Sequence, residues 1–211
     1  MSGGLRPADS DRSAMPIEPS RPDIARELIA REAAANAGWA RLVRGQLSDQ
    51  EIARGRAADH ANVQVLRRII DQHGWPGLSL VGGGGARAAW RIALRADDQL
   101  PDQRRASFLM YRAVRAGEAS LRQWVHLHDR CLLRYGSGQQ YGTQYGIGPG
   151  GLERQLVDQP VTLDVRRAEV GLPPAAVALE SLRRRLAEQP HSDTDGREAT
   201  VAALVELVTV A

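Results

Sequence analysis

The chain has a single cysteine and no lysine, and these two facts bear on the compartment and the partners that we expect. Because Cys131 has no partner within the chain, an internal disulfide is excluded, and we expect a reducing compartment, the cytoplasm. All 28 basic residues are arginines, the net charge is only +3 and no basic block occurs, so we expect no nucleic-acid partner. The longest apolar run, near 199–211, is too short to span a bilayer, and no signal peptide is recognisable, so we expect no membrane association.

Metal-binding motifs are also missing from the sequence. It contains neither CxxC nor HExxH, the spacings that bring zinc ligands together. His126 and His128 are two residues apart, which places them on different faces of a helix and makes them a poor chelate. We therefore expect neither a metal nor a cofactor.

Apolar residues recur at helical spacing along most of the chain, and no alternating pattern typical of strands recurs. Helix starts are marked by capping patterns such as the box formed by Ser48 and Glu51, and helix ends by glycines such as Gly74. The tetraglycine at 82–85 lacks the Lys-Ser/Thr of a P-loop, so we interpret it as a turn before a helix. The pattern predicts a mainly α protein, a single compact domain of about six to eight helices.

The predicted helical domain covers residues 20–190. Residues 1–19 are rich in Ser, Gly, Pro and Asp without apolar periodicity, which predicts a disordered tail. Residues 191–211 are expected to form a C-terminal extension, whose apolar end is a candidate contact for a homodimer.

The segment YGSGQQYGTQYG at 135–146 holds three of the four tyrosines of a chain that is only 4% aromatic. Its glycines permit tight backbone geometry, and its Tyr and Gln side chains offer uncharged donors and acceptors. We interpret it as a loop that shapes a pocket for a polar ligand. Two alternatives remain: an exposed low-complexity turn, and a tight polar knot that locks the helices together.

The segment WVHLHDR at 124–130 carries the clearest chemistry. On a helix His126, Asp129 and Arg130 share one face, where a carboxylate would raise the pKa of the imidazole and a guanidinium would hold an anion. The alternative is a surface ion pair. His128 falls on the apolar stripe and is expected to be a hydrogen-bonded core histidine.

Three polar residues of the second predicted helix are further candidates. Asp59 and Asn62 are spaced to line one cavity, or to form a solvated face. His73 ends the helix, where it serves either as a proton carrier or as a partner for a terminal carbonyl.

Several short pieces, in order, resemble a known family: HGWP, SLVG, AAW, the DR pair at 129–130, QQYGTQ and RRAEVGLPP. Together they are similar to a bacterial domain-of-unknown-function family, family 6624, over residues 58–185. The resemblance implies a compact, mainly helical domain and no nameable biochemical role. The residues that match the family by position are Asp129, Arg130, Gln140, Tyr141, Gly142, Thr143, Gln144 and Arg166. Arg95 stands where the family usually has histidine, and His126 where it usually has an aromatic residue.

From these observations we predict a cofactor-independent enzyme that uses acid/base chemistry (hydrolysis, elimination or cyclisation) on a small polar or anionic metabolite, within specialised biosynthesis. The residues expected to take part in catalysis are His126, Asp129, His73 and Tyr141. Those expected to bind substrate are Arg130, Gln140, Thr143, Gln144, Arg95, Arg166, Asp59 and Asn62. The alternatives are a non-catalytic ligand-binding, immunity or resistance protein, and a protein-interaction domain.

Overall fold

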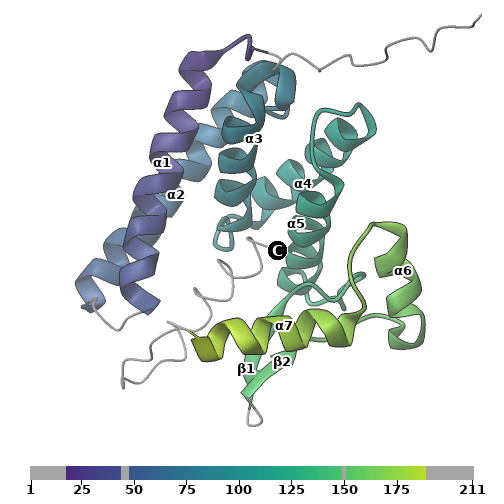
Figure 1. Ribbon diagram of the computed structural model, residues 1–211. Helices are drawn as coiled ribbons and strands as arrows, with labels where there is room; N and C mark the ends of the chain where they lie inside the picture. Colours follow the sequence, from purple (N-terminus) through teal and green to yellow (C-terminus); the bar gives the residue numbers. More distant parts are fainter. Residues whose placement is uncertain (1–17, 44–47, 149–150, 189–211) are drawn as a thin grey trace, which may run out of the picture.

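The computed structural model describes residues 18–43, 48–148 and 151–188 (Figure 1). They form α1 (Pro22–Val43), α2 (Asp49–His73), α3 (Leu78–Leu94), α4 (Leu100–Arg115), α5 (Leu121–Arg134), β1 (Tyr145–Gly148), β2 (Gly151–Arg154), the 3-10 turn η1 (Pro160–Thr162), α6 (Leu163–Glu169) and α7 (Ala175–Glu188). The mainly α class and the expected number of helices are confirmed. Apart from Glu18 and Pro19, the predicted tail at 1–19 lies outside the described residues, as does the predicted extension at 191–211.

The first five helices form a bundle around the main apolar core. α1 packs chiefly along α3, with α2 beside both, and α4 packs against α5. Side chains with less than 2% of their surface exposed come from each of these helices: Leu28, Leu66, Trp90, Met110 and Leu127. Each such burial contributes about 1.5–3 kcal/mol, so the apolar stripes read from the sequence are what hold the bundle together.

The predicted capping box at the start of α2 is present. The Ser48 N–H donates to Glu51 Oε2 at 2.9 Å, and the Glu51 N–H donates to Ser48 Oγ at 3.4 Å. Gly74 ends the helix with a φ of +77°, as its sequence position indicated.

The tetraglycine does not form a separate turn before a helix, as we expected, but lies inside α3. Only Gly82 leaves helical geometry, with φ +67° and ψ 175°, and it kinks the helix. Gly85 is needed for close packing, because a Cβ there would lie 2.7 Å from Val81 Cβ and 3.2 Å from the Ala25 Cα on α1. The glycines therefore let α1 and α3 approach each other.

A small antiparallel hairpin follows α5 and was not predicted. β1 and β2 pair with Tyr145 opposite Arg154, and both strands are only four residues long. Tyr145 and Leu152 of the hairpin pack with Leu182 of α7 in a second, smaller apolar cluster. Figure 1 shows α7 crossing the hairpin below the bundle. The Tyr/Gln-rich loop joins the bundle to the hairpin, because it lies between α5 and β1.

Asp164 lies in the first turn of α6 and links this helix to the next. Its Oδ1 accepts a hydrogen bond from the Ala175 N–H at 2.8 Å, at the start of α7. The carboxylate therefore holds α6 and α7 together.

Candidate functional site

Asp129 of α5 binds the loop rather than His126. Its side chain is fully buried, and Oδ1 accepts hydrogen bonds from the N–H groups of Gln140 and Tyr141 at 2.9 and 3.0 Å. Its Oδ2 accepts the N–H and the hydroxyl of Thr143, both at 2.9 Å. The predicted pairing of this carboxylate with the His126 ring is therefore wrong.

The hydrogen bonds at Asp129 also indicate its charge state. Burial raises the pKa of the carboxyl group, and the bonds from Thr143, Tyr141 and Gln140 oppose that rise. Every one of these bonds is donated to the carboxylate, as an ionised acceptor requires. Asp129 thus anchors the loop, and its oxygens are occupied rather than open to a substrate.

Two adjacent arginines of α6 hold the same loop from the other side. Arg166 Nε donates to the carbonyl of Gln140 at 2.7 Å, and Nη2 donates to that of Asp158 at 2.6 Å. Arg167, which is buried, donates from Nη1 to the Tyr141 carbonyl at 2.6 Å. The guanidinium of Arg166, which we expected to hold a substrate anion, is therefore committed to backbone carbonyls.

Gln139 closes the loop on itself, and no pattern in the sequence distinguished it from its neighbours. Its Oε1 accepts the Gln144 N–H at 2.6 Å, and Nε2 donates to the carbonyls of Gln144 and Gln155 at 3.0 and 3.1 Å. Gly142 lies between them with φ +62°, and a Cβ there would meet Arg154 Cδ at 2.9 Å. The loop is thus a tight polar knot, the second of the two alternatives open from the sequence.

One side of the knot packs into an aromatic cluster. The His128 ring stacks on Trp124 with centroids 4.8 Å apart, and Tyr141 meets both rings edge-on. His128 Nε2 lies 3.0 Å from Gln140 Oε1, so His128 is the hydrogen-bonded histidine that the sequence indicated. Burial raises the pKa of Tyr141, which therefore stays a neutral phenol at physiological pH.

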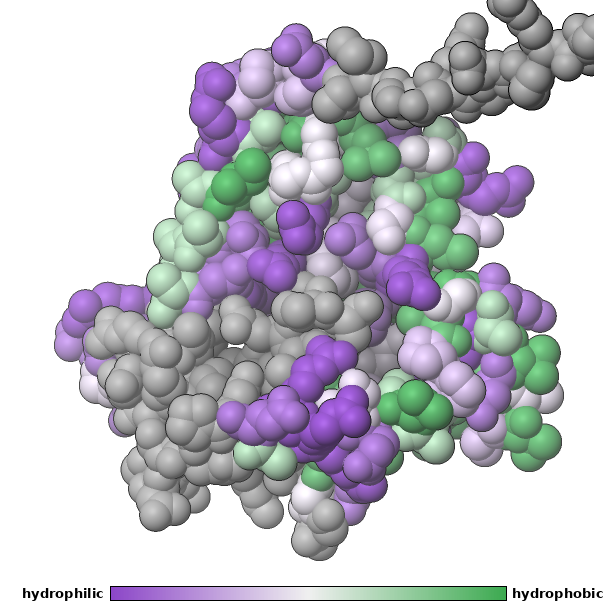
Figure 2. Space-filling model, viewed as in Figure 1, coloured by the Kyte–Doolittle hydropathy of each residue, from purple (hydrophilic) through white to green (hydrophobic). Residues whose placement is uncertain are grey.

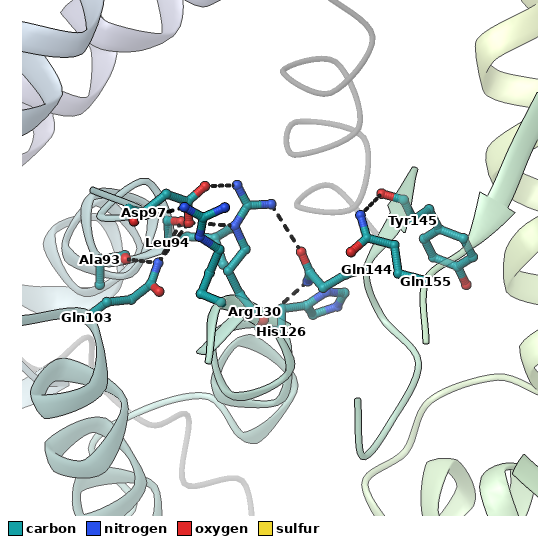
Figure 3. Close-up of polar contacts among 10 residues, drawn as sticks. Ala93, Leu94, Asp97, Gln103, His126, Arg130, Gln144, Tyr145 and Gln155 are labelled. Carbon is teal, nitrogen blue, oxygen red and sulfur yellow. Dashed lines mark hydrogen bonds and ion pairs between the residues drawn. The ribbon is translucent and has the colours of Figure 1, made fainter. Parts of the chain in front are cut away.

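The other side of the knot meets Arg130 of α5 (Figure 3). Arg130 Nε donates to Asp97 Oδ1 at 2.9 Å, Nη2 donates to Asp97 Oδ2, and Nη1 lies 3.4 Å from Gln144 Oε1. The Gln144 Nε2 donates to the carbonyl of His126 at 3.2 Å. Arg130 and Gln144, both predicted from the sequence, therefore do come together, and His126 lies beside them.

His126 carries a neutral imidazole. Burial, with a smaller contribution from the charge of Arg167, lowers its pKa to about 4, whereas we expected Asp129 to raise it. The ring lies edge-on to Trp90, with centroids 6.4 Å apart. Its Nδ1 is shielded from solvent and has no hydrogen-bond partner among the residues that the structure describes, which is rare for a buried polar atom.

Tyr145, the first residue of β1, continues this side of the knot. Its hydroxyl is shielded from solvent and makes no hydrogen bond of normal geometry within the described part of the chain. Burial raises its pKa, against the opposing effect of the nearby Arg167 and Arg154 charges, so the phenol stays protonated. We call His126, Arg130, Gln144 and Tyr145 the His126 cluster.

Figure 2 shows the surface of the molecule coloured by hydropathy. Hydrophilic residues lie on this surface over α7, and further hydrophilic residues lie over α3 and α5.

A model of the Family of unknown function (DUF6624) matches residues 22–188. The chain belongs to this family. The resemblance noted in the sequence is confirmed at this level, and the match begins earlier than the 58–185 that we expected, so that it includes α1. Comparisons with curated proteins and with solved structures find no match.

Within the DUF6624 region, the three candidate residues of α2 lie apart from the His126 cluster. Asn62 is buried, and its Oδ1 accepts a hydrogen bond from Arg31 Nη1 at 3.4 Å. Asp59 lies one turn before it. His73, which is exposed, lies with its Nε2 3.2 Å from Arg21 Nη1. The hydrogen-bond partners of Asn62 and His73 thus lie in α1 or directly before it, and not in α5.

Arg95 ends α3, two residues before Asp97. Its Nη2 donates to Asn36 Oδ1, and Arg91, one turn earlier, forms an ion pair of 2.6 Å with Glu32. These contacts tie α3 to α1. At the position where the family usually has histidine, this chain therefore has an arginine whose guanidinium bonds to the neighbouring helix.

Two negative findings concern the described parts of the DUF6624 chain. They contain no group of three or more His, Cys, Asp or Glu residues arranged to hold a metal ion. No helix within residues 18–43, 48–148 and 151–188 is both long and apolar enough to cross a membrane.

A cavity of about 220 Å³ lies between Trp75, Met110 and Gln123. No residue of the Tyr/Gln-rich loop lines this cavity.

Proposed function

We propose that the protein is a cofactor-independent enzyme that transfers a proton on a small polar or anionic metabolite at the His126 cluster, with His126 as the proton acceptor. The observation that carries the proposal is the neutral His126 ring, in a half-buried residue, whose Nδ1 is shielded from solvent and has no hydrogen-bond partner among the described residues. A neutral imidazole has a free lone pair on one nitrogen, which a general base requires.

The charges around His126 favour an anionic substrate. The pKa of His126 is low because the ring is buried and Arg167 lies near it. A bound anion would offset the field of Arg167 and favour the protonated ring, which moves the pKa back towards neutrality. His126 would then become an effective base only when the substrate is present.

In this proposal Arg130 holds the substrate anion. A guanidinium has five N–H donors, of which Asp97 takes two and Gln144 a third through a long contact of 3.4 Å. The remaining donors suit a carboxylate or a phosphate. The Gln144 side chain and the protonated Tyr145 hydroxyl would orient the uncharged part of the substrate.

The pairing of Arg130 with Asp97 limits the negative charge of the substrate that the site would hold. Because the ion pair already neutralises one charge, the site holds a substrate of low charge rather than a polyphosphate. Reactions that need one proton transfer and one bound anion are hydrolysis, elimination and cyclisation, and the proposal covers this group.

The experiment is a screen of small carboxylates and phosphate esters by thermal stabilisation, followed by an NMR assay for turnover of those that bind. His126→Phe keeps a flat ring against Trp90, so we expect it to fold, and we expect turnover to fall about a hundredfold or more. The matched control is His73→Phe, an exposed histidine on α2, which should keep full activity. Full activity in His126→Phe would refute the proposed role.

A second candidate is a ligand-binding protein without catalysis at the same site, and the low pKa of His126 favours it. An imidazole with a pKa of about 4 is a weak base at neutral pH, although it is a good hydrogen-bond acceptor. This candidate predicts binding of an anion without turnover, and a His126→Phe variant that loses affinity only.

A further inference from the structure

The exposed aromatic side chains lie together on one surface of α4 and α5. Phe108, the only phenylalanine in the chain, is 62% exposed, and Tyr111 and Tyr135 are 38% and 46% exposed. Among the aromatic residues whose exposure the structure describes, these three are the exposed ones. Arg104 joins them, since its guanidinium carbon lies 5.4 Å from the centre of the Tyr135 ring.

The spacing of these residues makes a straight ridge. Arg104, Phe108, Tyr111 and Arg115 follow each other on α4 at intervals of four, three and four residues, so they share one helix face. At 1.5 Å per residue the ridge is about 16 Å long, which is three turns of a helix lying alongside it. We call Arg104, Phe108, Tyr111, Tyr135 and Arg115 the α4 ridge.

The ridge carries positive charge that the described residues leave unpaired. Neither Arg115 nor its neighbour Arg112 forms a hydrogen bond or ion pair with a described residue, and the Arg104 guanidinium lies over the Tyr135 ring. The only acidic residue of α4 is Asp102, at its first turn, and it lies 3.9 Å from Arg67. Exposed aromatic rings beside arginines are the composition that protein interfaces favour.

We infer that the α4 ridge docks an acidic, amphipathic helical segment of a partner protein. Charge complementarity identifies the partner: its carboxylates would meet the arginines, and its apolar residues would cover Phe108. A second copy of this chain fits poorly, because two ridges would bring arginines face to face. This inference is independent of the function proposed for the His126 cluster.

The geometry of the rings disfavours nucleic acid as the partner. Bases stack on free flat faces of aromatic rings. One face of Tyr111 is taken by Trp124, whose ring centre lies 4.7 Å away, and one face of Tyr135 is covered by Arg104. Each of these two rings therefore has one face fewer for stacking, whereas the Phe108 side chain and the ring edges suit aliphatic side chains.

The test is a selection of helical peptides of about sixteen residues, displayed as a library on phage, against the full-length protein. We expect the selected sequences to share apolar residues at helical spacing flanked by Asp and Glu. One synthesised peptide is then titrated by fluorescence anisotropy. Phe108→Ala should weaken its binding at least tenfold, and added salt should weaken it further. The control Val177→Ala, an exposed residue of α7, should leave binding unchanged.

Each other outcome overturns the inference. A failure to enrich acidic peptides, or binding that survives Phe108→Ala, would show that the ridge is not the docking site. Binding of a twenty-nucleotide oligothymidylate that depends on Phe108 would identify nucleic acid as the partner. Self-association of the protein in sedimentation that Phe108→Ala abolishes would identify a second copy. Circular dichroism of each variant checks that the exposed substitution leaves the fold intact.

Discussion

Replacing Asp129 by asparagine should destabilise the protein strongly while changing the shape of the side chain very little. The carboxylate accepts four hydrogen bonds of 2.9–3.0 Å, three of them from the backbone N–H groups of Gln140, Tyr141 and Thr143. An asparagine keeps one oxygen for two of these donors. Its NH₂ group faces the donors of Thr143, so the N–H of Thr143 loses its partner.

The magnitude follows from these bonds. A buried N–H without a partner costs about 1–3 kcal/mol, and each of the two retained bonds loses roughly 0.5–1 kcal/mol when its acceptor is no longer charged. The sum is about 3 kcal/mol, a large part of the 5–15 kcal/mol that typically stabilises a domain. The melting temperature should fall by about 6–12 °C.

Urea denaturation followed by circular dichroism measures this change in the free energy of unfolding. The control is Asp98→Asn, an exposed aspartate between α3 and α4, which should change stability by less than about 0.5 kcal/mol. If Asp129→Asn costs no more than the control, the carboxylate does not anchor the loop, and a catalytic role for it would have to be considered again.

Three further predictions follow from single residues. Ser48→Ala removes the cap of α2 and should cost about 1 kcal/mol in the free energy of unfolding. Cys131 is buried and its pKa is raised to about 11, so iodoacetamide should label it at pH 8 only after denaturation, as mass spectrometry would detect. Because the pKa of His126 falls from 6.5 to about 4 on folding, the unfolded chain binds the proton first as pH falls. Stability from this group is therefore full above about 6.5 and is lost as the pH falls towards 4, so in urea titrations wild type should lose stability relative to His126→Phe across that window.

The helices of this protein were predictable because their signals are local. The capping box at Ser48, the glycine at 74 and the apolar stripes each act within one helix, and the structure retains them. The hairpin was not predictable, because its two strands are four residues long and rich in glycine. Its pairing depends on contacts with α7, which lies more than twenty residues further along the chain.

The candidate site shows where spacing along a helix stops being informative. His126 and Asp129 share a face in the sequence, but residues three apart still differ by about 60° around the axis. In the structure one side chain lies against Trp90, and the other binds the loop. The meeting of Arg130 with Gln144 was anticipated, whereas the ion pair with Asp97 required the end of α3 to be placed beside α5.

The most direct test of the account is the pKa of His126, measured by NMR from the ring carbon-bound protons, with and without inorganic phosphate as a probe anion. His126→Phe identifies the resonance by its loss. We predict a pKa of about 4 in the free protein and a rise of at least about one unit when phosphate saturates the site. A pKa near 6.5 in the free protein, or one that phosphate leaves unchanged, would contradict an imidazole that is shielded from solvent and that an anionic substrate activates.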